Sequence, residues 1–167
     1  NNLNFKPLFI INTHGHIDHI CANNYFSEKY GIPVYIHSLE REFLSEPELN
    51  LSYFSGVDYI PAENILEINE SDNIDFNQVK LEILHTPGHT RGSISVLMNE
   101  ILFSGDLLFN EGVGRTDLPT GNWDDLEKSL KQKIYTLPGH FKVFPGHGPE
   151  TIIEHEKNNN PFVKGSR

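Results

Sequence analysis

His14-Gly15-His16-Ile17-Asp18-His19 places three imidazoles and one carboxylate within six residues, directly after the apolar run Leu8-Phe9-Ile10-Ile11-Asn12. The apolar run is typical of a short buried strand. A strand that ends here delivers its last residues into a loop, where alternate side chains can reach one cation and the next pair a second cation. The stretch therefore predicts a metal site at the end of a strand.

Further residues of the same ligand types recur downstream, each in a turn marked by glycine and each after a β-like run. These turns are Pro87-Gly88-His89-Thr90, Ser104-Gly105-Asp106 and Pro145-Gly146-His147-Gly148. A surface loop that is merely rich in histidine would not require such partners. The recurrence favours a metal centre built from several segments.

Thr13 to His19 reproduces the signature Thr-His-x-His-x-Asp-His, and on it the chain resembles the metallo-β-lactamase fold superfamily. The resemblance continues through Gly112–Pro119 and the His147 turn to Asn160-Pro161-Phe162, so it spans Leu8 to Val163. The later segments resemble the glyoxalase II-like branch, the hydroxyacylglutathione hydrolases, in a short form without their C-terminal helical domain. The resemblance implies an α/β fold, a four-layer αβ/βα sandwich.

The residue types suggest that seven donors converge: His14, His16, Asp18, His19, His89, Asp106 and His147. The resemblance implies that His14, His16 and His89 bind one divalent ion, that Asp18, His19 and His147 bind a second, and that Asp106 bridges the two. Zn²⁺ is the first expectation for both ions, and histidine and aspartate ligands also accept Fe or Mn.

The resemblance implies a hydrolase that cleaves a small-molecule thioester, with Asp18 and Asp106 as the catalytic carboxylates. Coordination by two metals lowers the pKa of a shared water to about 7, so a metal-bridging hydroxide is available at neutral pH as the nucleophile. A thiolate leaving group needs little protonation. The acyl group, the thiol carrier and the oligomeric state are not encoded in any readable motif.

Three other function classes stay open. A related branch, the persulfide dioxygenases, uses one Fe(II) held by the equivalents of His14, His89 and Asp106, but usually lacks the Gly-His-Gly form found at Gly146–Gly148. β-Lactam hydrolysis is disfavoured because Asp106 occupies a position where lactam-cleaving branches carry a cysteine or a non-ligand. A non-enzymatic metal-binding scaffold is disfavoured by the intact ligand set.

The composition narrows the class of protein. A chain of 167 residues with 37% hydrophobic content can bury one sizeable core, so one domain over residues 1–167 is expected. The net charge of −10 opposes unassisted binding to nucleic acid or anionic membranes. The absence of a long apolar stretch or signal segment, with Cys21 as the single cysteine, predicts a soluble cytoplasmic protein. Cys21 itself is expected to be buried within a helix.

Hydrophobic periodicity and turn residues predict alternating strands and helices. The expected helices are Asp18–Tyr30 ended by Gly31, Ser38–Leu44, Asn122–Tyr135 with Leu126, Leu130 and Ile134 on one face, and a last helix with a Thr151/Glu154 capping box, ended by Asn158–Pro161. The expected strands are Pro33–Ile36, Gln78–His85, and a hairpin of Ser93–Met98 and Ile101–Ser104, with Ser45–Pro61 as a loop.

Two basic residues are candidates for binding substrate. Arg115 is expected mainly to form a buried ion pair with Asp117 that ties down the glycine-rich loop, with a substrate carboxylate as the alternative partner. On this interpretation Arg115→Lys should lower stability more than it raises KM. Lys142 is a substrate-binding candidate because it precedes the His147 turn.

The metal motif begins unusually early for the family that the chain resembles. Only Asn1–Asn12 precede it, which is enough for one strand. We therefore expect an N-terminally incomplete domain with an unpaired sheet edge beside Leu8–Asn12, unless residues within Ser45–Asn77 rebuild the first half.

Overall fold

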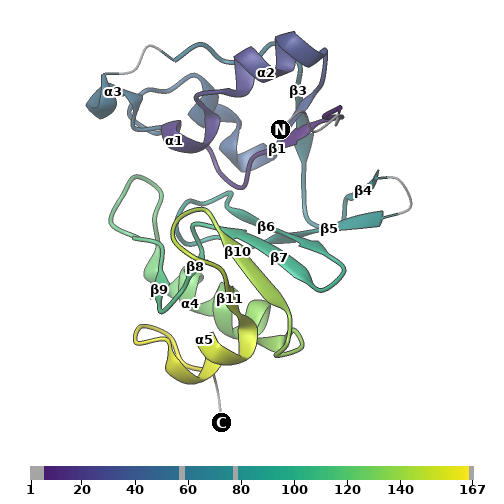
Figure 1. The fold of residues 1–167 in the computed structure, drawn as a ribbon. Coiled ribbons are helices and arrows are strands. Elements are labelled where there is room, and N and C mark those ends of the chain that lie inside the picture. Colours follow the sequence, from purple (N-terminus) through teal and green to yellow (C-terminus); the bar gives the residue numbers. More distant parts are fainter. Residues whose placement is uncertain (1–5, 57–58, 77–78, 166–167) are drawn as a thin grey trace. The chain divides into compact units, whose positions relative to one another are not determined.

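The computed structural model describes residues 6–56, 59–76 and 79–165. The backbone divides into two compact units, Asn1–Ile68 and Asn69–Arg167. Each unit contains its own sheet and helices (Figure 1). That residues 1–167 form one domain stays a prediction. Among the described residues, no helix has the length and apolar character needed to span a membrane.

The first unit is built on a parallel three-stranded sheet in the order β1-β2-β3. Its strands are β1 (Ile10–Ile11), β2 (Val34–His37) and β3 (Ile65–Ile68). The predicted strand Pro33–Ile36 is thus present as β2, and β3 comes from a region for which the sequence predicted no confident element. Four helical segments accompany the sheet: α1 (Ile17–Ile20), α2 (Asn23–Tyr30), the 3-10 helix η1 (Ser38–Leu44) and α3 (Ser52–Ser55).

The helix predicted over Asp18–Tyr30 is wrong in one respect, because it is divided into α1 and α2. The side-chain amide of Asn12 donates to the carbonyl of His19 at 3.0 Å, so a residue outside the helix takes this acceptor. The same Asn12 accepts a hydrogen bond from the Asn23 side chain at 2.7 Å, where α2 begins. Cys21 lies in the break and is exposed, which corrects its expected burial. The helix ends at Gly31, as predicted.

The predicted loop Ser45–Pro61 contains a short helix, α3. Its flanking residues fold back on the helices before it, since the Asn50 side chain donates to the Phe43 carbonyl at 2.7 Å. A small apolar core forms between the helices and the sheet of this unit. It consists of Ile17, Ile20, Ile36 and Leu44, with Tyr59 and Ile65 packed against them.

The second unit is built on a mixed six-stranded sheet in the order β11-β10-β7-β6-β5-β4. Its strands are β4 (Asn73–Phe76), β5 (Val79–His85), β6 (Ile94–Met98), β7 (Ile101–Gly105), β10 (Lys142–Pro145) and β11 (Thr151–Ile152). A separate pair, β8 (Leu108–Phe109) and β9 (Gly112–Val113), forms a two-stranded ribbon. The predicted β6–β7 hairpin is confirmed, with Met98 opposite Ile101. Gln78, predicted to start β5, lies outside the described residues.

Two helices pack against this sheet and form its main core, and they lie beside the green and yellow strands in Figure 1. The helix α4 (Trp123–Gln132) is followed by the 3-10 helix η2 (Ile134–Thr136), and α5 (Ile153–Asn159) lies near the C-terminus. Leu126, Leu130 and Ile134 are all fully buried, as their spacing predicted. The helix predicted over Asn122–Tyr135 is shorter, because the backbone tightens into η2 after Lys133.

The capping box predicted at Thr151 and Glu154 is wrong. Thr151 belongs to β11, and the residue that caps α5 is Ile152, which makes no side-chain cap. The Thr151 hydroxyl instead donates to the buried carboxylate of Glu156 at 2.6 Å. Because β11 runs directly into α5, Thr151 has an extended backbone, and its hydroxyl bonds to Glu156 inside the helix.

Candidate metal centre

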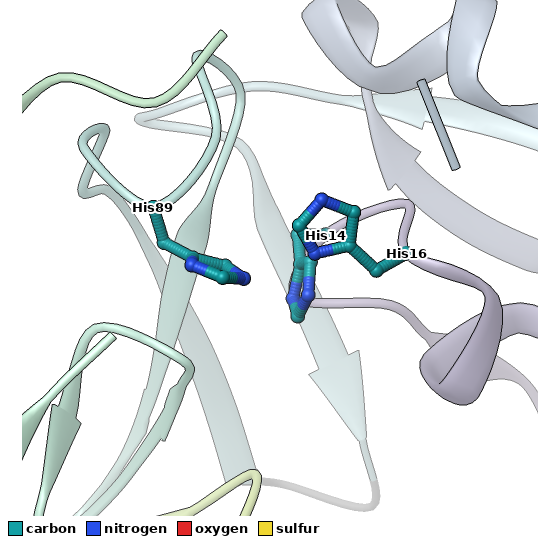
Figure 2. Close-up of side chains that lie close together, drawn as sticks. All are labelled: His14, His16 and His89. Atoms are coloured by element: carbon teal, nitrogen blue, oxygen red, sulfur yellow. The ribbon is translucent and has the colours of Figure 1, made fainter. Parts of the chain in front are cut away.

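The first unit carries four of the predicted ligands: His14 and His16 on the loop after β1, and Asp18 and His19 in α1. The ring centroids of His14 and His16 are 4.8 Å apart, and those of His14 and His19 are 4.1 Å apart. Figure 2 shows the side chains of His14 and His16 on this loop. The Asp18 carboxylate is largely exposed, and its Oδ2 lies 3.5 Å from Nε2 of His19. Three imidazoles thus gather where the loop after β1 enters α1, with a carboxylate beside the third.

Buried amides from three places in the first unit hold this loop. Asn23 donates to the Asn12 side chain, and Asn12 donates to the His19 carbonyl, as described above. The Asn50 carbonyl accepts the backbone N–H of Ile17 at 2.8 Å, which fixes the start of α1. A buried polar group must find a partner to avoid a large desolvation cost, so these bonds restrict the loop to one path. The sequence analysis missed them because no local motif marks them.

Gly15, between His14 and His16, is in close contact with η1. Its backbone N–H donates to Oε2 of Glu40 at 2.8 Å, and the Glu40 side chain is completely buried. A Cβ atom on Gly15 would lie 2.4 Å from Cβ of Phe43. Only glycine therefore permits this approach between the ligand loop and η1.

The second unit brings Asp106 and His147 together through the pairing of β7 with β10. The two strands are parallel, and Pro145 at the end of β10 is opposite Gly105 at the end of β7. The Gly146 N–H donates to the Gly105 carbonyl at 2.9 Å, so the two turns that follow are tied at their first residues. The Nε2 atom of His147 lies 3.6 Å from Oδ2 of Asp106.

His89 reaches the same carboxylate from the turn after β5. Figure 2 shows the His89 side chain. Its Nε2 lies 3.7 Å from Oδ2 of Asp106. Its Nδ1 lies 2.8 Å from the Arg115 carbonyl, which can only accept, so Nδ1 carries the proton and Nε2 presents its lone pair. Gly114 makes room for this arrangement, since a Cβ there would lie 1.8 Å from the Asp106 carbonyl oxygen.

The donors fit divalent metal ions by their chemistry. In the second unit, two imidazole nitrogens flank one carboxylate oxygen, and the His89 ring is oriented by an outer hydrogen bond, as is usual for a metal ligand. The first unit offers three more imidazoles and one more carboxylate. Each unit thus assembles part of the predicted ligand set. The union of the two parts in one centre, and the roles of Asp18 and Asp106 as catalytic carboxylates, stay predictions.

Arg115 and Asp117 form the expected ion pair, but its expected burial is wrong. The guanidinium donates from Nε to Oδ1 and from Nη2 to Oδ2 of Asp117, both at 2.7 Å. The two side chains are 62% and 69% exposed. The hydrogen bonds from Arg115 lower the pKa of Asp117 to about 2. Because solvent screens an exposed pair, it cannot anchor the loop as a buried pair would.

Lys142 lies at the far end of the strands from the ligands. It begins β10 and pairs with Ile101, the first residue of β7, whereas Asp106 and His147 follow the last residues of these strands. Its side chain is exposed. This position gives no support to the predicted contact between Lys142 and a substrate bound at the ligands.

A family comparison identifies the chain. The family model described as the metallo-β-lactamase superfamily matches residues 3–147. The chain belongs to the metallo-β-lactamase superfamily. Among curated relatives, a probable metallo-hydrolase of Streptococcus pyogenes is 42% identical over 94% of this chain and 71% of its own length. The hydroxyacylglutathione hydrolase GloC of Haemophilus influenzae is 34% identical over 97% of this chain and 77% of its own length.

Solved structures of the superfamily confirm the predicted α/β fold class. The BLEG-1 B3 metallo-β-lactamase is 39% identical with a TM-score of 0.87, over 96% of this chain and 79% of its own. TTHA1623 in a di-iron-bound form is 33% identical, also with a TM-score of 0.87, over 97% of this chain and 80% of its own.

Proposed function

We propose that this chain is a metal-dependent hydrolase that cleaves small-molecule thioesters of the hydroxyacylglutathione type. The observation that carries the proposal is the Asp106 carboxylate between two imidazoles, with Oδ2 at 3.7 Å from His89 Nε2 and 3.6 Å from His147 Nε2. A carboxylate in this position is the residue type expected to bridge two divalent ions. The likeness to GloC, whose name gives a hydroxyacylglutathione hydrolase, supports the substrate class.

The ligands would be His14, His16 and His89 for one ion, Asp18, His19 and His147 for the other, and Asp106 for both. Two bound divalent ions would supply a water of lowered pKa and an electrophile for the substrate carbonyl. Zn²⁺ is our first choice, and the di-iron form of TTHA1623 makes iron the main alternative.

The protein's own groups act by orientation and charge. The Arg115 carbonyl fixes the tautomer and direction of the His89 ring, so that Nε2 needs no reorganisation to act as a ligand. The bond between Gly146 and Gly105 fixes the spacing of the Asp106 and His147 turns. A thiolate departs without a proton, so this set requires no separate general acid for a thioester, whereas an amide would benefit from one.

β-Lactam hydrolysis is the second candidate, because the BLEG-1 B3 metallo-β-lactamase is 39% identical to this chain. Against it stands the residue type at position 106. We expect a bridging carboxylate to favour thioester substrates over lactams, and the two activities can be measured on the same preparation.

The test compares S-lactoylglutathione with a chromogenic cephalosporin on protein whose metal content is measured by elemental mass spectrometry. We expect about two divalent ions per chain and turnover of the thioester at least tenfold faster than of the lactam. Faster lactam turnover would select the second candidate. Metal-loaded protein that hydrolyses neither, but consumes oxygen with a glutathione persulfide, would refute both.

A further inference from the structure

Glu40 is a completely buried acidic residue, and one of its contacts is to the metal-ligand loop. It lies in η1, and its Oε2 accepts the Gly15 backbone N–H at 2.8 Å. Gly15 is the residue between His14 and His16. The bond therefore fixes the peptide from which both neighbouring imidazoles project.

The packing around Gly15 makes this contact specific. Phe43, one turn further along η1, would collide with any Cβ at Gly15. Its ring centroid lies 6.1 Å from that of His16. The Phe43 carbonyl also accepts a hydrogen bond from the side-chain amide of Asn50. The backbone carbonyl of Asn50 in turn accepts the N–H of Ile17. Thus η1 supports the loop from Gly15 to the start of α1.

A neutral glutamine could accept the same hydrogen bond without the cost of burying a charge. A carboxylate at this place is favourable where positive charge is bound close by. The loop that Glu40 contacts offers His14 and His16 as ligands for such charge, and α1, which follows it, offers His19.

We propose that Glu40 is a positioning residue of the metal centre: it holds the Gly15 peptide so that His14 and His16 face the ion, and its buried negative charge offsets the ion's positive charge. The inference rests on the metal-binding part of the proposed function and is independent of the substrate. It assigns η1, predicted only as a short helix, a role in metal affinity.

The test is Glu40→Gln, which keeps the volume and the acceptor but removes the charge. We expect the Zn²⁺ affinity, measured by competition with a chromophoric chelator, to fall by about 10- to 100-fold. The melting temperature of metal-free protein should stay the same or rise, since a buried charge is removed. If Glu40 had only a structural role, the variant would instead lower the melting temperature of metal-free protein and leave the Zn²⁺ affinity unchanged.

Glu156→Gln is the matched control. Glu156 is also completely buried and accepts the N–H of Glu111 at 3.0 Å, but its other partners are Thr151 and Asn160, and none of the three is a predicted ligand. We expect this variant to lower the melting temperature of metal-free protein, because the single oxygen of a glutamine amide cannot replace both carboxylate oxygens, which accept from three donors. The Zn²⁺ affinity should stay within twofold of the wild type.

Gly15→Ala keeps every charge but forces the loop away from Phe43 and Glu40. If Glu40 acts through Gly15, the double variant Gly15→Ala/Glu40→Gln should lose less affinity than the two single effects multiplied together. Full multiplicativity would overturn the positioning role, and so would an affinity of Glu40→Gln within twofold of the wild type.

If Glu40→Gln does not fold, weakened Zn²⁺ binding by folded Gly15→Ala supports the role, and unchanged binding refutes it. Wild-type protein that binds no divalent ion would refute this inference and the proposed function together, whereas metal binding without thioester turnover would refute only the latter.

Discussion

At the scale of single residues, Asp106 lies close to two other predicted ligands. One of its oxygens faces both His89 and His147, which come from turns 58 residues apart (147 − 89). The side chain is only 10% exposed. Among the predicted ligands of the second unit, only Asp106 carries a negative charge. Its removal therefore changes the charge balance as well as the geometry.

Asp106→Asn should therefore abolish most metal binding with little change in shape. We expect the affinity for at least one ion to fall by more than the roughly 100-fold that loss of an outer partner costs, and thioester turnover to fall with it. Elemental analysis after dialysis and steady-state kinetics measure the two effects. Asp117→Asn is the control, and near-normal turnover by metal-loaded Asp106→Asn would contradict the bridging role.

The exposed pair of Arg115 and Asp117 leads to a prediction about pH. Folding lowers the pKa of Asp117 to about 2, below the value of about 3.9 for a free aspartate. The stabilisation by the pair is therefore fully present above pH about 3.9 and is lost as the pH falls through about 2. In Arg115→Gln the pKa of Asp117 should return toward about 3.9 in a carboxyl NMR titration.

The same exposure reverses the expectation that Arg115→Lys would mainly lower stability. We now expect its melting temperature to change little, because solvent screens both partners. A loss of several degrees would show that the pair anchors the loop after all. A wild-type Asp117 that titrates near pH 3.9 would contradict the pairing itself.

At the scale of elements, α4 is connected to the turn that carries His89. The Asn122 side chain caps α4 by accepting the Asp125 N–H at 3.1 Å. The Asn122 N–H donates to the Gly88 carbonyl at 2.8 Å, and the Ser129 hydroxyl donates to the Pro87 carbonyl at 2.7 Å. The N-cap of α4 and Ser129, further along the helix, thus hold the two residues before His89.

Asn122→Ala removes the cap but keeps the backbone bond to Gly88. We expect a loss of about 1 kcal/mol in the free energy of unfolding, measured by urea denaturation. Asn122→Asp should retain the cap and stay close to the wild type. Equal destabilisation by both variants would show that packing at Asn122, rather than the cap, supports the helix.

At the scale of the whole molecule, the proposed centre takes ligands from both units, so metal binding should couple their unfolding. Free metal at 100 times its Kd should raise the free energy of unfolding by about 2.7 kcal/mol. Trp123, the single tryptophan, reports on the second unit by fluorescence, and far-UV circular dichroism reports on both. With metal bound, the two signals should give coincident transitions.

The control for this coupling is Asp106→Asn. In this variant, added metal should shift both transitions less than it does in the wild type. A metal-dependent shift in tryptophan fluorescence alone would contradict the coupling. It would indicate that the second unit binds metal by itself through His89, Asp106 and His147.

Most candidate ligands could be predicted from the sequence because they lie in glycine-marked turns after a strand, and Asp18 and His19 follow the first of these turns in α1. The order strand, turn and ligand is local, and β5, β7 and β10 all follow it. The β6–β7 hairpin and the buried face of Leu126, Leu130 and Ile134 were predictable for the same reason. Periodicity and turn chemistry act over a few residues and are written directly in the chain.

The sequence by itself thus determined the superfamily, the turns and the residue types of the candidate ligands, whereas only the tertiary structure decided which residues support them. Glu40 reaches Gly15 across 25 residues, and Asn12 reaches Asn23 across the break between α1 and α2. His147 approaches Asp106 because β10 pairs with β7 in one register. The exposure of Arg115, Asp117 and Cys21 could likewise not be predicted from the sequence. Such contacts and exposures depend on which segments pack together, and a local pattern carries no information about a partner that is distant along the chain.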